Sequence, residues 1–290
     1  MKFWQPITWT ETEQLCDIAV FAEELGFEGL MGADHALYPE QMAPDYPYSD
    51  TGRPPQSGDS EYPDMWTSSA AMAAVTQRIK LTCGVYVLPA RHPIEVAKQA
   101  ATLAIISKGR FIMGVGTGWM KEEFDAFDVD FKTRGKRMDE MIDAMQLLWQ
   151  GEMVEYHGEH IDFPRIQISP TPTYDIPFYF GGAAPIALRR AALRGQGWIG
   201  AGNTPDEVAP VVNKLNALRK EYGREHLPFD TLIGIKARPT LDLFKSLEDT
   251  GMTSSLAMPF AFSLGWRSSL DDKKRMMEKF AEDVLRHLAE

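Results

Sequence analysis

Short apolar runs alternate along the whole chain with longer segments whose apolar residues recur every three or four positions. The short runs are typical of buried strands, and the three-to-four spacing is typical of helices that cover a core. Regular alternation of strands and helices indicates a parallel sheet, because each helix returns the chain to the end where the next strand begins. The predicted strands lie at residues 3–7, 28–32, 79–88, 110–116, 177–181, 197–200, 232–237 and 254–258.

Capping residues mark the predicted ends of several helices. Thr10 and Glu13 form a capping box before the first helix, and Gly26 provides its C-terminal stop. Thr204 and Glu207 form a second capping box further along the chain. A methionine-rich helix at residues 133–150 is expected to pack on the core, and residues 154–163 are expected to form a hairpin.

Eight strands, each leading into a helix, favour a closed barrel over an open doubly wound sheet. A (β/α)8 TIM barrel needs about 250 residues and tolerates insertions, so the sequence predicts a single α/β domain over residues 1–290. The insertions follow strands 2 and 4, at residues 36–64 and between residues 116 and 177. The first is rich in Pro, Tyr, Asp and Gly and is interpreted as a substrate wall or lid, or as a plain surface loop.

The composition narrows the classes of partner. Hydrophobic residues make up 44% of the chain and charged residues 24%, values close to those of ordinary globular domains. The net charge is −11 and no basic run is present, so neither nucleic acid nor an anionic membrane is expected as a partner. Two isolated cysteines and the lack of a signal-like or membrane-spanning run predict a cytoplasmic location.

Asp34 and His35 directly follow the second predicted strand. The loops after barrel strands form the active-site face, and histidine handles protons near neutral pH, so His35 is the candidate catalytic residue. The alternative is a turn whose histidine is satisfied locally. A metal-dependent hydrolase using Asp34, His35 and His92 is disfavoured, because the six histidines are scattered and no set of metal ligands gathers at strand ends. No metal is expected.

Glycines gather at the ends of two predicted strands, and another lies inside a third. The GVGTGW run at residues 114–119 lacks the small sixth residue of a dinucleotide fingerprint, but it allows close approach of a planar ligand, with Trp119 as a pocket wall. The GGAA run at residues 181–184 lies where a strand passes into a helix, where free N–H groups favour a phosphate. Gly84 inside the third strand indicates a bulge or a ligand's close approach. In each case the alternative is a glycine required only for packing or for a turn.

These segments together resemble the luciferase-like monooxygenase family, and within it the reductases that use the deazaflavin coenzyme F420. The similarity extends over nearly the whole chain. Its most specific stretches are PARHP at 89–93 with AKQ at 97–99, GR at 109–110 with GVGTGW at 114–119, and FGG at 180–182 with ALRRAA at 187–192 and GWI at 197–199. In combination they are far more specific than any one alone.

The resemblance implies a role for each candidate residue. His35 would handle a proton beside the reactive edge of the cofactor ring, and a bulge with a non-proline cis peptide bond at residues 84–85, or else 83–84, would lie behind the ring. Trp119 would belong to the substrate pocket; some relatives carry a glutamate there for sugar-phosphate oxidation, so its absence argues against that activity. The expected cofactor-binding residues are Asp34, His35, Gly84, Val85, Thr117, Gly118, Gly181, Gly182, Ala183 and Ala184.

The resemblance further implies an oxidoreductase that transfers a hydride between coenzyme F420 and a small organic substrate, and that forms a homodimer. FMN is the alternative cofactor, and it would imply a monooxygenase that uses O2 and a partner flavin reductase. The acidic tail of F420 would need basic residues outside the pocket, for which the candidates are Arg53, Arg189, Arg190 and Arg267. A non-catalytic flavin-storage barrel, which would not need His35, is a further alternative.

Overall fold

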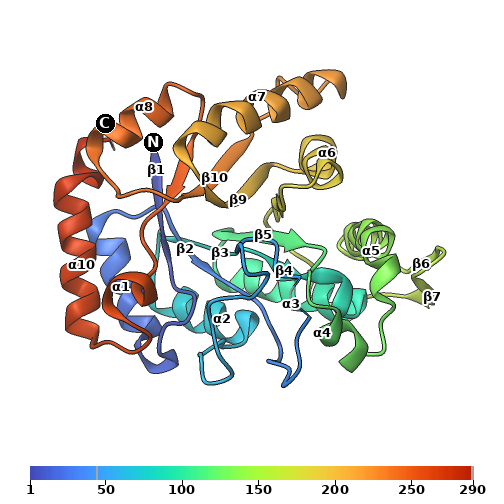
Figure 1. The fold of residues 1–290 in the computed structure, drawn as a ribbon. Helices are drawn as coiled ribbons and strands as arrows, with labels where there is room; N and C mark the ends of the chain where they lie inside the picture. The colour runs from blue at the N-terminus through green and yellow to red at the C-terminus, as the bar shows by residue number, and fades with distance from the viewer. Residues whose placement is uncertain (44, 289–290) are drawn as a thin grey trace.

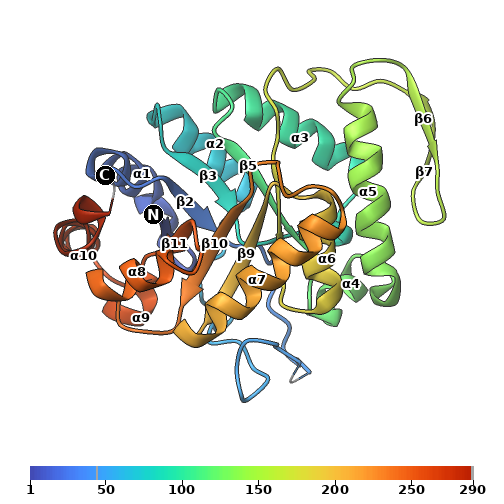
Figure 2. The same ribbon diagram turned by 90° about the horizontal axis from the view of Figure 1, so that it is seen from above.

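A closed barrel of parallel strands forms the centre of the computed structural model, which describes residues 1–43 and 45–288 (Figures 1 and 2). The strand order in the described sheet is β3-β2-β1-β11-β10-β9-β8-β5-β4, and β3 also pairs with β5, which closes the barrel. Each predicted strand is found, so the (β/α)8 TIM barrel is confirmed. The barrel strands are β1 (Lys2–Pro6), β2 (Gly29–Gly32), β3 (Lys80–Cys83), β5 (Phe111–Gly116), β8 (Phe178–Gly181), β9 (Gly197–Asn203), β10 (Asp230–Ile235) and β11 (Ser254–Leu256).

Helices surround the strands, as the view from above shows (Figure 2). These helices lie where the sequence has its amphipathic segments, and their apolar faces are turned to the sheet. Within the described residues, no helix is long and apolar enough to span a membrane. The helices are α1 (Leu15–Leu25), α2 (Met65–Val75), α3 (Pro93–Ile106), α4 (Lys121–Ala126), α5 (Arg134–Leu148), α6 (Pro185–Arg194), α7 (Pro205–Glu221), α8 (Leu241–Glu248), α9 (Phe260–Leu264) and α10 (Leu270–Asp283).

The capping predictions have mixed outcomes. The Thr204 box is present at the start of α7, and Gly26 ends α1 with a left-handed φ of 91°. The box predicted at Thr10 is wrong, because α1 begins at Leu15 after a short 3-10 turn. Glu11 instead binds the buried ammonium of Lys273 on α10, and this long-range contact sets the path of the chain before the helix.

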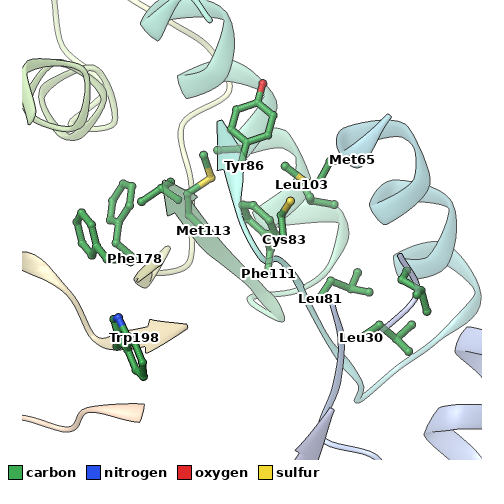
Figure 3. Packing of buried hydrophobic residues seen from close by; sticks show 14 of the residues in the cluster. Leu30, Met65, Leu81, Cys83, Tyr86, Leu103, Phe111, Met113, Phe178 and Trp198 are labelled. Atoms are coloured by element: carbon green, nitrogen blue, oxygen red, sulfur yellow. The ribbon is translucent and has the colours of Figure 1, made fainter. Parts of the chain in front are cut away.

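The core has two layers on either side of the barrel wall. Side chains alternate along each strand, so Phe3 points outward to Phe244 and Phe280 whereas Trp4 is fully buried inside the barrel. Figure 3 shows part of the outer layer, where residues of β3, β5, β8 and the surrounding helices pack together. The methionines of α5 belong to this layer, as the sequence predicts.

The two insertions differ in structure. Residues between β2 and α2 form a long loop that carries no helix or strand among those described. The second insertion contains α4, α5 and an antiparallel hairpin of β6 (Val154–His157) and β7 (Asp162–Ile166). The predicted hairpin is therefore confirmed, and it projects from the α5 side, away from the barrel axis (Figures 1 and 2).

Candidate functional site

A cavity of about 830 Å³ lies at the carboxyl ends of the barrel strands. Side chains from the loop after β2 form one wall of it, as predicted for this insertion, and they include three tyrosines. Rings from other loops complete an aromatic lining. The aromatic residues that line the cavity are Trp9, Tyr46, Tyr48, Tyr62, Trp119, Phe244 and Phe262.

Most of the predicted site residues line this one cavity. Those that do are Asp34, His35, Gly84, Val85, Gly118, Trp119, Gly181 and Gly182. Thr117, Ala183 and Ala184 do not line it, although each is adjacent in sequence to a lining residue or lies in the same turn. The part of all these residues in binding stays a prediction.

His35 is fixed by a carboxylate that the sequence analysis missed. Its Nδ1 lies 3.1 Å from Glu123 Oε2, and Oε1 of the same carboxylate accepts the N–H of Ala36 at 2.6 Å. The rings of Tyr62 and Trp119 contact the imidazole edge-on, with centroid distances of 5.5 Å and 5.7 Å. Glu123 lies in α4, directly after the glycine-rich end of β5. An acidic residue just beyond a predicted ligand loop was the available signal.

Asp34 has a structural partner on each oxygen. One oxygen accepts the N–H of Val87 at 2.9 Å, and Nη2 of Arg91 lies 3.2 Å from the other. Burial raises the pKa of the Asp34 carboxyl, and the Arg91 guanidinium and the Val87 N–H oppose that rise. Arg91 therefore ties the end of β2 to the start of α3.

The chain breaks its strand at residues 84 and 85, between β3 and the short strand β4 (Tyr86–Val87). The Gly84–Val85 peptide bond is cis, as the sequence analysis predicts. The N–H of Gly84 donates to the carbonyl of Gly32 at 2.9 Å, which joins the break to β2. A Cβ at Gly84 would overlap the side chain of Met31, which would have to move, so glycine lets this backbone lie in the cavity wall without displacing its neighbour.

The junction between β8 and α6 presents free backbone donors. Gly182 has φ +108°, and its carbonyl accepts the indole N–H of buried Trp198 at 3.0 Å, which fixes the turn. Within the described part of the chain, no hydrogen bond uses the N–H groups of Ala183, Ala184 or Ile186. Such groups at the start of a helix favour an anion, because they add to the positive end of the helix dipole.

The three tyrosines of the cavity wall differ from free tyrosine in their pKa. Burial raises the pKa of Tyr46 to about 12 and raises the pKa of Tyr48 and Tyr62 as well, so all three phenols stay neutral near pH 7. The described residues contain no cluster of three or more His, Cys, Asp or Glu side chains that could hold a metal ion. Of the predicted tail-binding arginines, Arg53 lines the cavity, whereas Arg190 pairs with Asp139 of α5.

Comparisons with known proteins find relatives that align over most of the chain. An uncharacterized protein of Mycobacterium tuberculosis (strain ATCC 25618 / H37Rv) is 34% identical over 287 residues, which cover 98% of this chain and 99% of the relative. The F420-dependent glucose-6-phosphate dehydrogenase of Nakamurella multipartita is 32% identical over 278 residues, which cover 93% of this chain and 75% of the relative.

Two solved structures with the same fold are described as different kinds of enzyme, a monooxygenase and a reductase. The monooxygenase RslO1 from Streptomyces bottropensis superposes with a TM-score of 0.76 at 20% identity, covering 99% of both chains. The coenzyme F420 dependent tetrahydromethanopterin reductase from Methanopyrus kandleri gives 0.75 at 18% identity with the same coverage. At these identities the structures show the shared fold alone. The luciferase-like monooxygenase family model matches residues 5–239, and the chain therefore belongs to the luciferase-like monooxygenase family.

Proposed function

We propose that the protein is an oxidoreductase that transfers a hydride between coenzyme F420 and a small organic substrate. One observation carries the proposal: His35 with its buried partner Glu123, the glycine break at residues 84–85 and the free N–H groups before α6 surround or border a single cavity. We further propose that residues 1–290 act as one domain, in the cytoplasm and as a homodimer.

The site has the features that such a cofactor requires. A volume of about 830 Å³ lies within the range of roughly 300–1,000 Å³ that ligand pockets occupy. The side-chain-free backbone at Gly84 offers a surface for a planar ring, and the Gly182 turn offers donors for a phosphate. We therefore assign the ring to the Gly84–Val85 wall and the phosphate to residues 181–184.

When bound, the deazaflavin supplies the ring carbon that accepts or gives the hydride. The chain's own task is to handle the accompanying proton and to exclude water. Glu123 occupies Nδ1 of His35, so Nε2 is the atom that takes the proton from a substrate hydroxyl as the hydride leaves the adjoining carbon, or returns it in the reverse direction. Neutral Tyr62 and Trp119 flank the imidazole and keep its surroundings apolar.

The relative from Nakamurella multipartita supports F420, because it is described as F420-dependent and aligns over most of this chain. Arg53 in the cavity wall forms no ion pair within the described residues and is the best placed of the candidates for an acidic tail. The aromatic wall and Trp119 favour an apolar substrate over a sugar phosphate. FMN with O2 and a partner flavin reductase is the second candidate, because RslO1 shares the fold and is described as a monooxygenase.

The test is a titration of the purified protein with F420 and with FMN at matched ionic strength, followed by turnover with a panel of apolar alcohols with and without oxygen. We expect tighter binding of F420 and hydride transfer that needs no oxygen. Tighter binding of FMN with oxygen-dependent turnover would overturn the F420 assignment. Binding without any turnover would favour the storage barrel.

A further inference from the structure

Glu123 is a glutamate whose side chain is almost completely buried. Its side chain is 1% exposed, and no lysine or arginine among the described residues forms an ion pair with it. Both of its oxygens point to consecutive residues of the loop after β2, namely His35 and Ala36. A buried carboxylate is costly unless hydrogen bonds satisfy it, so this arrangement indicates a specific role for the two bonds that it accepts.

The two bonds together determine where the imidazole carries its proton. The N–H of Ala36 is always a donor, so Glu123 Oε1 must accept it. An ionised carboxylate has no proton to give, so in that state Oε2 also accepts, and Nδ1 of His35 is the donor. In neutral His35, Nε2 then has a free lone pair, and no hydrogen bond within the described part of the chain occupies it.

The aromatic neighbours do not determine which ring nitrogen of His35 carries the proton. Tyr62 and Trp119 contact the ring edge-on at interplanar angles of 77° and 78°, which fixes its plane but distinguishes neither nitrogen. Of the groups around the imidazole, Glu123 is thus the one whose hydrogen bond selects the tautomer. The same logic operates in catalytic triads, where a buried carboxylate orients the histidine and fixes its protonated nitrogen.

We propose that Glu123 is the positioning residue of His35: by holding the imidazole as the Nδ1–H tautomer, it makes Nε2 the proton acceptor in the cavity. The catalytic consequence rests on the proposed function. The tautomer itself does not, so it can be measured on the protein without cofactor or substrate.

Substitution of Glu123 by Gln gives a sharp test because the amide has a fixed polarity. The N–H of Ala36 will attract the amide oxygen, so the amide NH2 will face Nδ1 of His35 and force that nitrogen to accept. We expect nitrogen NMR of histidine-labelled protein to show Nδ1–H in the parent and Nε2–H in Glu123→Gln. The His35 signal among the six histidines is identified by its loss in His35→Gln. An Nε2–H tautomer in the parent, or no change in the variant, would overturn the proposal.

Glu122 provides a matched control. It precedes Glu123 and accepts the N–H of Ala43 at 2.8 Å, and it makes no contact with His35. We expect Glu122→Gln to leave the tautomer and kcat unchanged. We expect Glu123→Gln to lower kcat by about 10²-fold, the lower end of the range for acid–base catalysis, with KM for the cofactor within about threefold.

Glu123→Asp separates positioning from folding. It keeps a carboxylate, so it should retain the Nδ1–H tautomer and recover part of kcat; an Asp variant as slow as the Gln variant despite the parental tautomer would contradict the positioning role. These variants also distinguish failure of the proton role proposed for His35 from failure of the positioning role proposed for Glu123. If the tautomer changes in Glu123→Gln but His35→Ala keeps full turnover, the proton role of His35 is wrong and Glu123 still positions the ring.

Discussion

Two histidine–carboxylate pairs in this protein make nearly the same contact in opposite surroundings. His157 lies 2.7 Å from Asp162 on the hairpin of β6 and β7, and both side chains are exposed, at 62% and 73%. His35 lies 3.1 Å from Glu123, where the corresponding values are 13% and 1%. The shorter contact is thus the one in water.

The difference shows that distance alone does not mark a functional pair. Asp162 raises the pKa of His157 through its hydrogen bond, but water competes for both groups, and neither residue lines the cavity at the strand ends. At His35 the carboxylate is withdrawn from water, both of its oxygens are used, and the free ring nitrogen belongs to a residue of the cavity wall. Burial and position turn the same chemistry into a candidate catalytic group.

The largest expected effect separates the two histidines directly. His35→Ala should lower kcat by about 10²–10⁴-fold, because it removes the proposed proton acceptor, and it should leave cofactor affinity within about threefold. His157→Ala, which removes the exposed partner, should leave both parameters at the parental value. Steady-state kinetics and a binding titration measure the two effects. Equal turnover in parent and His35→Ala would reduce His35 to a loop residue.

Two lysine–carboxylate pairs whose lysines lie on α10 test whether burial also decides how much an ion pair contributes to stability. Lys273 of α10 is 1% exposed and lies 2.6 Å from Glu11, whereas Lys279 on the same helix forms an exposed pair with Asp283 at 2.9 Å. Lys273→Met should reduce the free energy of unfolding by about 3 kcal/mol, because Glu11 is left buried without its cation. Lys279→Met should change it by less than about 0.5 kcal/mol. Urea unfolding gives both values, and similar losses in the two variants would contradict the argument from burial.

The cavity beside His35 is also expected to hold the cofactor phosphate. Gly182→Val should raise the dissociation constant of the cofactor at least tenfold, or about 1.4 kcal/mol, since a side chain there disturbs the turn that presents the N–H groups. Gly223→Val is the matched control: Gly223 has φ +65° and empty space around it, so the variant has comparable backbone strain away from the cavity. Unchanged affinity in Gly182→Val would place the phosphate elsewhere.

The smallest effect concerns the exposed pair and pH. The folded-state pKa of His157 is raised, so the stabilisation from Asp162 is present below the unfolded value of about 6.5 and is lost as pH rises through the folded value. Asp162→Asn should therefore lower the melting temperature slightly at about pH 5.5 and not at about pH 8.5. A larger loss at the higher pH would contradict the sign of this linkage.

Much of the barrel could be predicted from the sequence, because its strands are short apolar runs whose period and flanking glycines are local signals. The break at Gly84 and the glycine turn at Gly182 carry local signals of the same kind. The pairing of Glu123 with His35 could not be predicted, because the two residues lie 88 positions apart and only the closed barrel brings α4 beside the end of β2.

The error at Thr10 has the same origin. The capping pattern is present in the sequence, but Glu11 forms a buried contact with Lys273, and the two residues are 262 positions apart. A long-range ion pair outweighed a local preference that is worth only about 1 kcal/mol. Local signals predict elements well, whereas pairs between distant segments need the fold.

A crystal structure of the protein with F420 tests the proposed site most directly. We expect the phosphate oxygens within hydrogen-bond distance of the N–H groups of Ala183 and Ala184, the ring against the Gly84–Val85 wall, and Nε2 of His35 facing the ring or the substrate beside it. A phosphate bound away from the β8–α6 turn, or a ring that does not approach His35, would contradict the proposed arrangement.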